Sequence, residues 1–160
     1  MKEIGVVTRI YADTSVFSGV CDDVFSDASI RFFDQIREGK FSLIISDLIH
    51  RKIEGAPKEV QSFFRAMLPL AEIAQITKET LLLRDAYIAS GILTAKSIDD
   101  ALHVAIATIN ECQLIVSWNF KHIVHYQKIP LYNAVNILNG LQQIHIFSPM
   151  EVIEYGSEKI

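Results

Sequence analysis

Short, largely apolar segments alternate with segments of helical periodicity along almost the whole chain, and this alternation constrains the fold more than any other feature. The apolar segments lack a regular polar alternation, so a sheet built from them would be covered on both faces. Helical segments between successive strands are typical of parallel connections. We therefore predict an α/β fold, a three-layer α/β/α sandwich with a mostly parallel central sheet.

The limits of the predicted elements follow from apolar periodicity and from capping residues. The predicted strands are residues 6–12, 41–46, 113–119 and 143–149, and residues 70–76 are either a further strand or the end of a helix. The predicted helices are residues 22–39, 47–56, 58–68, 78–92, 97–112 and 133–141, with a last helical turn at 150–155. Asp47 is a suitable N-cap, and Gly39 and Gly91 are typical helix stops.

The first long predicted helix is rich in aromatic residues. Phe25, Ile30, Phe33 and Ile36 are expected on one side of it, and Phe32 adds more aromatic surface than one face needs. This surplus either packs against a partner protein or belongs to the core, and core packing is the commoner outcome.

Composition narrows the class of protein. The chain has 160 residues, half of them hydrophobic, which suits a single domain over residues 1–160 with a substantial core. A net charge of −4 gives no general attraction to nucleic acid, although a local basic patch or a metal ion could offset it. The two cysteines, Cys21 and Cys112, lack CxxC spacing, and no apolar run is long enough for a membrane span. We expect a cytoplasmic protein.

Polar residues stand where predicted strands end. Asp13 follows the first strand, and Asn119 ends the strand at 113–119. In parallel α/β sheets, ligands bind at the carboxyl ends of the strands. Asp13 is therefore either an N-cap for the next segment or a carboxylate that serves metal binding or phosphate transfer.

Two adjacent carboxylates open the helix predicted at residues 97–112. One of Asp99 and Asp100 is explained by favourable interaction with the helix dipole, but the second adds repulsion that a divalent cation would offset. Asp99 and His103 are four residues apart and could form an ion pair. A lone histidine in an alanine-rich helix is more often structural than catalytic.

The segment "SWNFKHI" gives a further group of polar side chains. Ser117 and Asn119 are two residues apart and share a strand face, whereas Trp118 points the other way. Lys121 and His122 follow and could contact a phosphate. A polar loop with one packed tryptophan is the alternative interpretation.

Metal chemistry is the class of activity that the motifs leave open. The chain has no GxGxxG, GxxxxGK[ST] or GxSxG motif, which argues against dinucleotide, P-loop and serine-hydrolase sites. Carboxylates at strand ends suit Mg²⁺ or Mn²⁺ better than zinc. Carboxylate clusters that hold Mg²⁺ typically act on phosphodiesters.

Four segments in order resemble the PIN-domain family, which includes toxins and other metal-dependent ribonucleases. They are "YADTSVF", "ISDLIHRKIEGAP", "SIDDALHVAIA" and "LIVSWNFKHI", and the resemblance is strongest over residues 8–150. It implies a PIN-like domain that cleaves single-stranded RNA with Mg²⁺ or Mn²⁺. It also implies a homodimer, and the role of toxin in a toxin–antitoxin pair with an antitoxin-like protein partner.

The resemblance assigns roles to individual residues. Asp13 matches the first family carboxylate and Asp100 the third, so both are expected to bind metal. Asp99 either assists or only caps the helix. Ser15 and Ser117 match the small hydroxyl positions that line such sites.

Two positions depart from the family pattern. The second family acid falls on Lys52, and Glu54 is close in sequence but rotated by about 200° around the helix. The last family position often carries Asp, and here it is Asn119, whose carbonyl oxygen can ligate a metal without adding charge. Lys52 would repel a cation or bind a phosphate, and Lys121 is a second candidate for substrate binding.

Three functions remain open from the sequence. The first is an active metal-dependent ribonuclease. The second is a PIN module without catalysis that binds RNA or a protein, with Lys52, Lys121 and His122 contacting phosphate. The third is an aspartyl-phosphate enzyme with Asp13 as nucleophile, although its usual partner acids and lysine motif are not evident.

Overall fold

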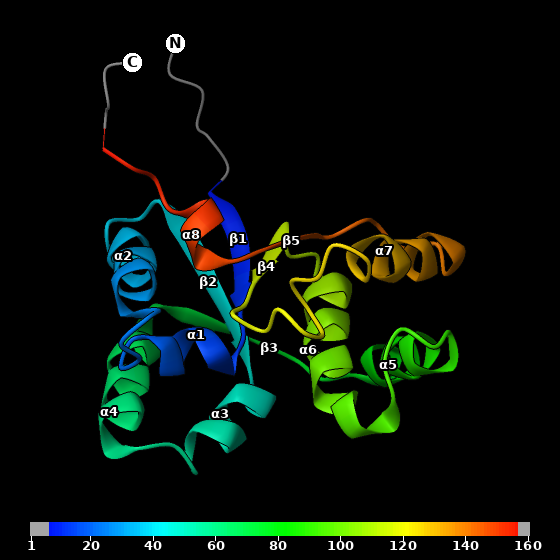
Figure 1. Cartoon of the computed structure of the whole chain (residues 1–160), viewed down its shortest axis with the longest axis horizontal. Helices are drawn as coiled ribbons and strands as arrows, with labels where there is room; N and C mark the ends of the chain where they lie inside the picture. Colours follow the sequence, from blue (N-terminus) through cyan, green and yellow to red (C-terminus); the bar gives the residue numbers. More distant parts are fainter. Residues whose placement is uncertain (1–6, 157–160) are drawn as a thin grey trace.

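The computed structural model describes residues 7–156, and its centre is one five-stranded sheet. The strands are β1 (Thr8–Ala12), β2 (Phe41–Ser46), β3 (Ala71–Ala74), β4 (Leu114–Val116) and β5 (His145–Phe147). They lie in the order β3-β2-β1-β4-β5, and every neighbouring pair is parallel. The predicted α/β class is confirmed, with a sheet that is parallel throughout these residues (Figure 1).

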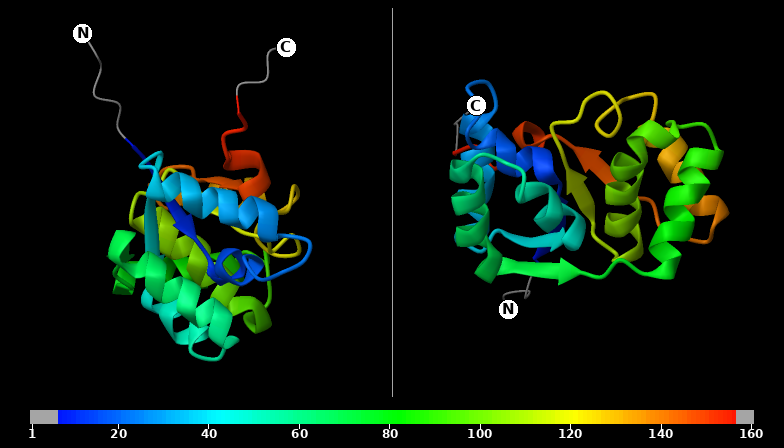
Figure 2. Two further views of the ribbon diagram at one scale, coloured as in Figure 1. Left: turned by 90° about the vertical axis from the view of Figure 1, so that its left-hand side faces the viewer. Right: turned by 90° about the horizontal axis from the view of Figure 1, so that it is seen from below.

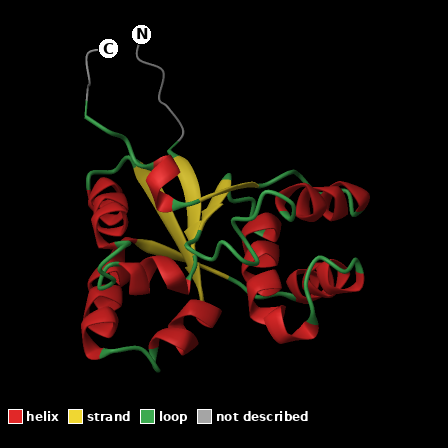
Figure 3. Cartoon of the chain, viewed as in Figure 1, coloured by secondary structure: helices red, strands yellow, loops and turns green. Residues whose placement is uncertain are grey.

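Helices cover both faces of the sheet, as Figures 2 and 3 show. The helices are α1 (Thr14–Gly19), α2 (Ser26–Arg37), α3 (Asp47–Ile53), α4 (Lys58–Met67), α5 (Lys78–Ala89), α6 (Ile98–Ile109), α7 (Ile129–Leu138) and α8 (Pro149–Val152). Short 3₁₀ helices occupy Leu68–Leu70 and Ala95–Ser97. Helices α1, α2 and α4 lie on one side, and α5, α6 and α7 lie on the other, with α5 packed closely on α6.

The structure differs from the predicted elements mainly around the polar segments. Helix α1 was not predicted, because Thr14–Gly19 is too short and too rich in hydroxyl residues to show helical periodicity. Strand β4 ends at Val116, before the predicted end at residue 119, and α7 begins earlier than residue 133, at Ile129. Residues 70–76 contain strand β3. Residue 6 of the first predicted strand lies outside the described residues.

The expected cap of the second predicted helix was wrong. Ser46 is the N-cap of α3, with extended backbone, and Asp47 is the first helical residue. Asp47 still complements the positive end of the helix dipole from this position.

The aromatic side of α2 belongs to the core. Phe32 and Phe33 are fully buried, and the Phe33 ring lies 4.8 Å from that of Phe17 in α1. Phe17 also meets Phe64 of α4 edge-on at 5.1 Å. Ile30, which was expected on this side, is 42% exposed. The surplus of aromatic side chains therefore fills the space between α1, α2 and α4, as core packing predicts.

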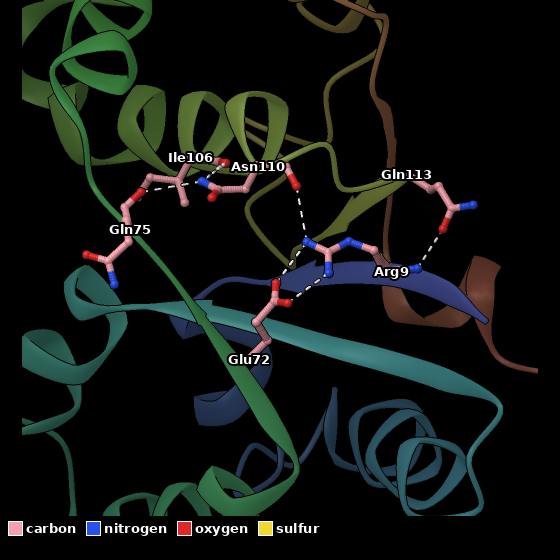
Figure 4. Close-up of polar contacts among 6 residues, drawn as sticks. All are labelled: Arg9, Glu72, Gln75, Ile106, Asn110 and Gln113. Atoms are coloured by element: carbon pink, nitrogen blue, oxygen red, sulfur yellow. Dashed lines mark hydrogen bonds and ion pairs between the residues drawn. The ribbon is translucent and has the colours of Figure 1, made fainter. Parts of the chain in front are cut away.

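The amino-terminal end of the sheet is closed by a polar network around Arg9 (Figure 4). The guanidinium of Arg9 in β1 pairs with Glu72 of β3 at 2.8 Å and donates to the carbonyl of Asn110, just after α6, at 3.1 Å. The backbone N–H of Arg9 donates to the Gln113 side chain at 2.6 Å. These contacts join β1, β3 and the α6–β4 connection, and they leave the opposite end of the sheet for ligands.

Within residues 7–156, no helix combines the length and the apolar character that crossing a membrane requires.

Candidate active site

Parallel strands bring the predicted polar residues to one edge of the sheet. Asp13 follows β1, Ser46 ends β2, and Ser117 follows β4, while Asp99 and Asp100 lie in the first turn of α6. Because β1 lies between β2 and β4, Asp13 is central in this arrangement. In Figure 1, β1 and β2 end next to α1 and α3.

Asp13 is a buried carboxylate held by hydroxyl groups. It is 3% exposed, and its Oδ1 accepts from the Ser15 backbone N–H at 3.0 Å and from the Ser15 hydroxyl at 2.5 Å. Its Oδ2 accepts from the Ser117 hydroxyl at 2.6 Å. The bond from Ser15 N–H makes Asp13 the N-cap of α1. Asp13 can therefore be both an N-cap and a functional carboxylate. One of its oxygens caps the helix, and the carboxylate as a whole stays fixed at the strand end.

Asp13 and Asp100 lie close enough for the charge of Asp100 to disfavour the charged form of Asp13. Burial raises the pKa of Asp13 to about 6, the hydroxyls of Ser117 and Ser15 act against this, and the charge of Asp100 adds to it. Burial also raises the pKa of Asp100, and the charge of Asp99 adds to this, against the lowering effects of Asn119, His122 and Lys52. A cation between the two carboxylates would relieve both penalties.

Asn119 turns its amide nitrogen, and not its oxygen, toward Asp100. Its Oδ1 accepts from the backbone N–H of His122 at 2.9 Å, and a backbone N–H can only donate, so the amide orientation is fixed. The side-chain NH₂ hydrogen-bonds to Asp100 and lowers the pKa of that carboxyl. The Asn119 oxygen keeps a second lone pair, so the expectation that it ligates a metal stays a prediction.

Lys52 forms an ion pair with Asp99. The Lys52 ammonium lies 2.7 Å from Oδ2 of Asp99, joins α3 to α6, and lowers the pKa of Asp99. The predicted pairing of Asp99 with His103 was wrong, because His103 is buried and lies against Tyr11. Asp99 is thereby paired with a lysine, whereas Asp100 is close enough to Asp13 for its charge to raise the pKa of the Asp13 carboxyl.

A buried chain of hydrogen bonds lies beneath the carboxylates, and the sequence did not reveal it. The Tyr11 hydroxyl lies 2.8 Å from Nδ1 of His103 and 2.8 Å from the hydroxyl of Ser46. Burial lowers the pKa of His103 to about 3, so its imidazole is neutral. Tyr11 shares a strand face with Asp13 by its spacing of two residues, which is the one sequence signal that pointed to it.

Within the described residues, neither Glu54 nor Lys121 contacts the carboxylate of Asp13 or Asp100. Glu54 follows the last residue of α3, is exposed, and lines a surface hollow with His50 and Gln61. Lys121 is exposed in the loop after β4. The neighbouring His122 comes close enough for its charge to lower the pKa of Asp100, and its buried Nδ1 has no hydrogen-bond partner.

The donor set fits a hydrated cation better than a caged one. Among residues 7–156, no group of three or more His, Cys, Asp or Glu side chains is arranged to hold a metal ion. Mg²⁺ is usually held by one or two carboxylates and completes its shell with water and substrate phosphate. Buried Asp13 and half-buried Asp100 would suit that kind of site.

Comparison with known proteins supports the fold. No protein-family model and no curated protein matches the sequence. A chain in the crystal structure of VapBC2 from Rickettsia felis, bound to a DNA fragment from its promoter, is similar with a TM-score of 0.55 and 13% identity. The match covers 71% of this chain and 90% of that one. The fold is PIN-like. At this identity the similarity concerns the fold alone.

Proposed function

We propose that the protein is a Mg²⁺- or Mn²⁺-dependent ribonuclease that hydrolyses phosphodiesters of single-stranded cytoplasmic RNA. The observation that carries the proposal is a pair of neighbouring carboxylates, buried Asp13 and half-buried Asp100, at the carboxyl end of a parallel sheet in a PIN-like fold. Burying Asp13 next to the charge of Asp100 costs stability, and a cation-dependent reaction would account for that cost.

Each residue of the site has a distinct role in this proposal. Asp13 and Asp100 would hold the ion, which supplies a Lewis acid and an activated water for attack on phosphorus. Ser15 and Ser117 fix the Asp13 carboxylate through hydrogen bonds to both of its oxygens. Asn119 orients Asp100.

Lys52 supplies the local positive charge that an acidic chain needs near an RNA backbone. Its ammonium is paired with Asp99 but remains partly exposed, so it can also meet a phosphate oxygen. Lys121, exposed beyond β4, is the second basic residue on the approach to the site.

Cleavage of a fluorophore-labelled single-stranded RNA tests the proposal. Asp13→Asn and Asp100→Asn should each lower the rate more than about 100-fold, and Ser117→Ala should cost about 10–100-fold because it removes a supporting hydrogen bond. Asp27→Asn is the matched control, since Asp27 is an exposed acid of α2 that pairs only with Arg31. Full activity in either variant of the carboxylate pair would contradict the proposal.

A PIN module without catalysis is the second candidate, and two contacts favour it. Where the family resemblance leads one to expect acids, Lys52 neutralises Asp99 and Asn119 donates to Asp100. The carboxylates of α6 are then satisfied by the protein itself, and Lys52, Lys121 and His122 would bind RNA phosphate.

Calorimetric titration of Mn²⁺ separates the two candidates. Binding to the wild-type protein that Asp13→Asn abolishes supports the ribonuclease. If neither protein binds Mn²⁺, the module without catalysis is the better description.

An antitoxin-like protein partner and a homodimer complete the proposal. The similar solved structure is a VapBC2 complex. In the present chain, α7 exposes Ile137 and Leu138 to 55% and 85%, and α5 exposes Leu82 to 59%. Such apolar side chains supply surface that a second protein can cover.

A further inference from the structure

A hollow with one aromatic wall opens directly beside the carboxylate pair. Its volume is about 390 Å³, and its lining includes Ser15, Gly19, Phe25, Trp118 and Asn119. This size falls within the range of small-ligand sites. The role proposed above for Asp13 and Asp100 does not use the hollow.

The hollow is continuous with the site through two of its lining residues. Ser15 donates its hydroxyl to Asp13, and Asn119 hydrogen-bonds to Asp100. A group bound in the hollow would therefore lie next to a phosphate held at the carboxylates. The Trp118 backbone N–H donates to the Ser15 oxygen at 2.8 Å, which ties the aromatic wall to the same loop.

The aromatic wall is rigid. Phe25 stacks on the Trp118 ring with centroids 4.2 Å apart and planes inclined by 20°. The indole N–H donates to the Ser29 hydroxyl of α2 at 2.8 Å. On its other side α1 approaches so closely that a Cβ at Gly19 would lie 2.8 Å from the indole nitrogen. The wall is fixed before any ligand arrives.

Phe120 is not itself a lining residue of the hollow, but its ring lies next to those of two lining residues, Phe25 and Trp118. Its ring centroid lies 6.1 Å from that of Trp118 and 6.4 Å from that of Phe25, yet the residue is 50% exposed. Trp118, in contrast, is only 7% exposed, so its faces are covered by protein. The free aromatic surface at this place belongs to Phe120.

We propose that the hollow receives a nucleobase of single-stranded RNA, which stacks on Phe120 while the adjoining phosphate lies at Asp13 and Asp100. This inference rests on the proposed action on RNA, and it adds the side chain on which a base of the substrate stacks. Stacking on an aromatic side chain tolerates any base, because every base has a π face. Ser18, Asp22 and Asn119 add polar groups that can meet the edge of the base.

Trp118 is the only tryptophan of the chain, so its fluorescence reports on this hollow. The experiment titrates the protein with tetrauridylate, in EDTA and again in Ca²⁺, and follows both Trp118 emission and the anisotropy of a labelled RNA. A tetramer with abasic riboses keeps the phosphates and removes the bases. Tetrauridylate should change Trp118 emission, and the abasic chain should bind about tenfold more weakly without that change.

A Phe120→Leu variant keeps an apolar side chain but removes the stacking surface. It should weaken tetrauridylate binding about tenfold and leave the melting temperature unchanged, since the residue is half exposed. Tyr155→Leu is the control, because Tyr155 is similarly exposed, at 56%, and lies beyond α8.

The outcomes separate this inference from the function on which it rests. If RNA binds the wild-type protein but abasic RNA and Phe120→Leu bind equally well, the stacking site is overturned and the proposed function stands. If the wild-type protein binds no RNA in anisotropy under either condition, both are overturned.

Discussion

At the scale of the residue, Asp13 has one of the two roles that its sequence context offered, the N-cap of α1, and its geometry is compatible with the other, a functional carboxylate. It caps α1 through the Ser15 N–H and presents a carboxylate whose pKa burial raises to about 6. The capping bond and the two serine hydroxyls reduce the electrostatic cost of burial without removing it. Asp13 should therefore lower the stability of the folded protein while it serves the proposed function.

The metal-free protein should become more stable when this charge is removed. Asp13→Asn should raise the free energy of unfolding at pH 7 by about 1–3 kcal/mol, because a shift from 3.8 to about 6 is worth roughly 3 kcal/mol before the altered hydrogen bonds are counted. Urea denaturation in EDTA measures the difference between the two proteins.

The sign of the pH dependence follows from the direction of the shift. Between pH 6 and pH 3.8 the folded state binds a proton that the unfolded state does not, so the penalty is complete above pH 6 and disappears as the pH falls toward 3.8. The advantage of Asp13→Asn should shrink over the same range. Buried His103, whose pKa is lowered to about 3, acts in the opposite direction but is common to both proteins and cancels. A destabilised variant at pH 7 would contradict this account.

Lys52 carries a positive charge that would oppose cation binding at the proposed site. Lys52→Glu removes an ammonium that lies 2.7 Å from Asp99 and adds a carboxylate beside the site. Affinity for Mn²⁺ should rise about tenfold or more, since ligand charge tunes the affinity of such sites. Calorimetric titration of Mn²⁺ into the wild-type protein and the variant measures this difference in affinity.

Lys40→Glu is the matched control for this substitution. Lys40 is also a partly exposed lysine in an ion pair, with Glu154 at 3.0 Å, but it belongs to the loop before β2. Equal Mn²⁺ affinity in wild type and Lys52→Glu would show that Lys52 does not limit binding.

At the scale of the element, α1 is the helix on which the site depends. It begins at the Asp13 cap and ends at Gly19, where it passes close to Trp118 and Ser29. One short helix thus fixes the position of the first carboxylate and one side of the aromatic hollow. Its stability comes from burial of Val16 and Phe17, because a six-residue helix has little stability of its own.

Gly19→Ala should destabilise the protein although alanine favours helices. The added Cβ would lie 2.6 Å from the Ser29 hydroxyl and 2.8 Å from the Trp118 indole nitrogen, so α1 or the indole must shift. The expected cost is about 1–3 kcal/mol, measured by urea denaturation with Trp118 emission as the probe.

Gly55→Ala provides the comparison, because its Cβ would meet only the Lys52 carbonyl at 3.8 Å, an ordinary contact. Equal stability of the two alanine variants would show that the close approach at Gly19 is not required.

At the scale of the whole molecule, the acidic net charge and the acidic site both disfavour RNA unless cations compensate. The net charge is −4, and the carboxyl end of the sheet, where the proposed site lies, holds Asp13, Asp99 and Asp100. The proposed reaction therefore needs local positive charge, from Lys52 and from a divalent ion.

The proposed homodimer is tested at the same scale. Light scattering after size-exclusion chromatography should give about twice the 18.0 kDa chain mass. Leu138→Glu should shift the protein toward the monomer if the apolar side chains of α7 form the interface, since Leu138 is 85% exposed and its replacement cannot disturb the core. Tyr126→Glu, at a position 90% exposed outside α7, is the control. If the wild-type protein is a monomer at tens of micromolar, the proposed homodimer is contradicted.

Much of the fold could be predicted from the sequence, because its signal is local. The apolar runs at 41–46 and 113–119 and the helical periodicity at 58–68 and 78–92 reflect burial that repeats within each segment. Helix α1 was not predicted because six residues are too few to show the helical periodicity of apolar side chains. Strand β4 ends earlier than predicted, at Val116, although the Ser117 backbone N–H still donates to the carbonyl of Phe147 in β5 at 3.1 Å.

The sequence by itself determined that the chain builds a parallel α/β sheet, since helical segments alternate with short apolar strands. It also determined that Asp13 stands where a strand ends, since Asp13 directly follows the first apolar segment. Only the tertiary structure decided that Lys52 pairs with Asp99, that Asn119 presents its NH₂ to Asp100, and that Tyr11 meets His103. These contacts join elements far apart in the chain. Their geometry depends on how the helices pack on the two faces of the sheet, and spacing within one segment carries no information about that packing.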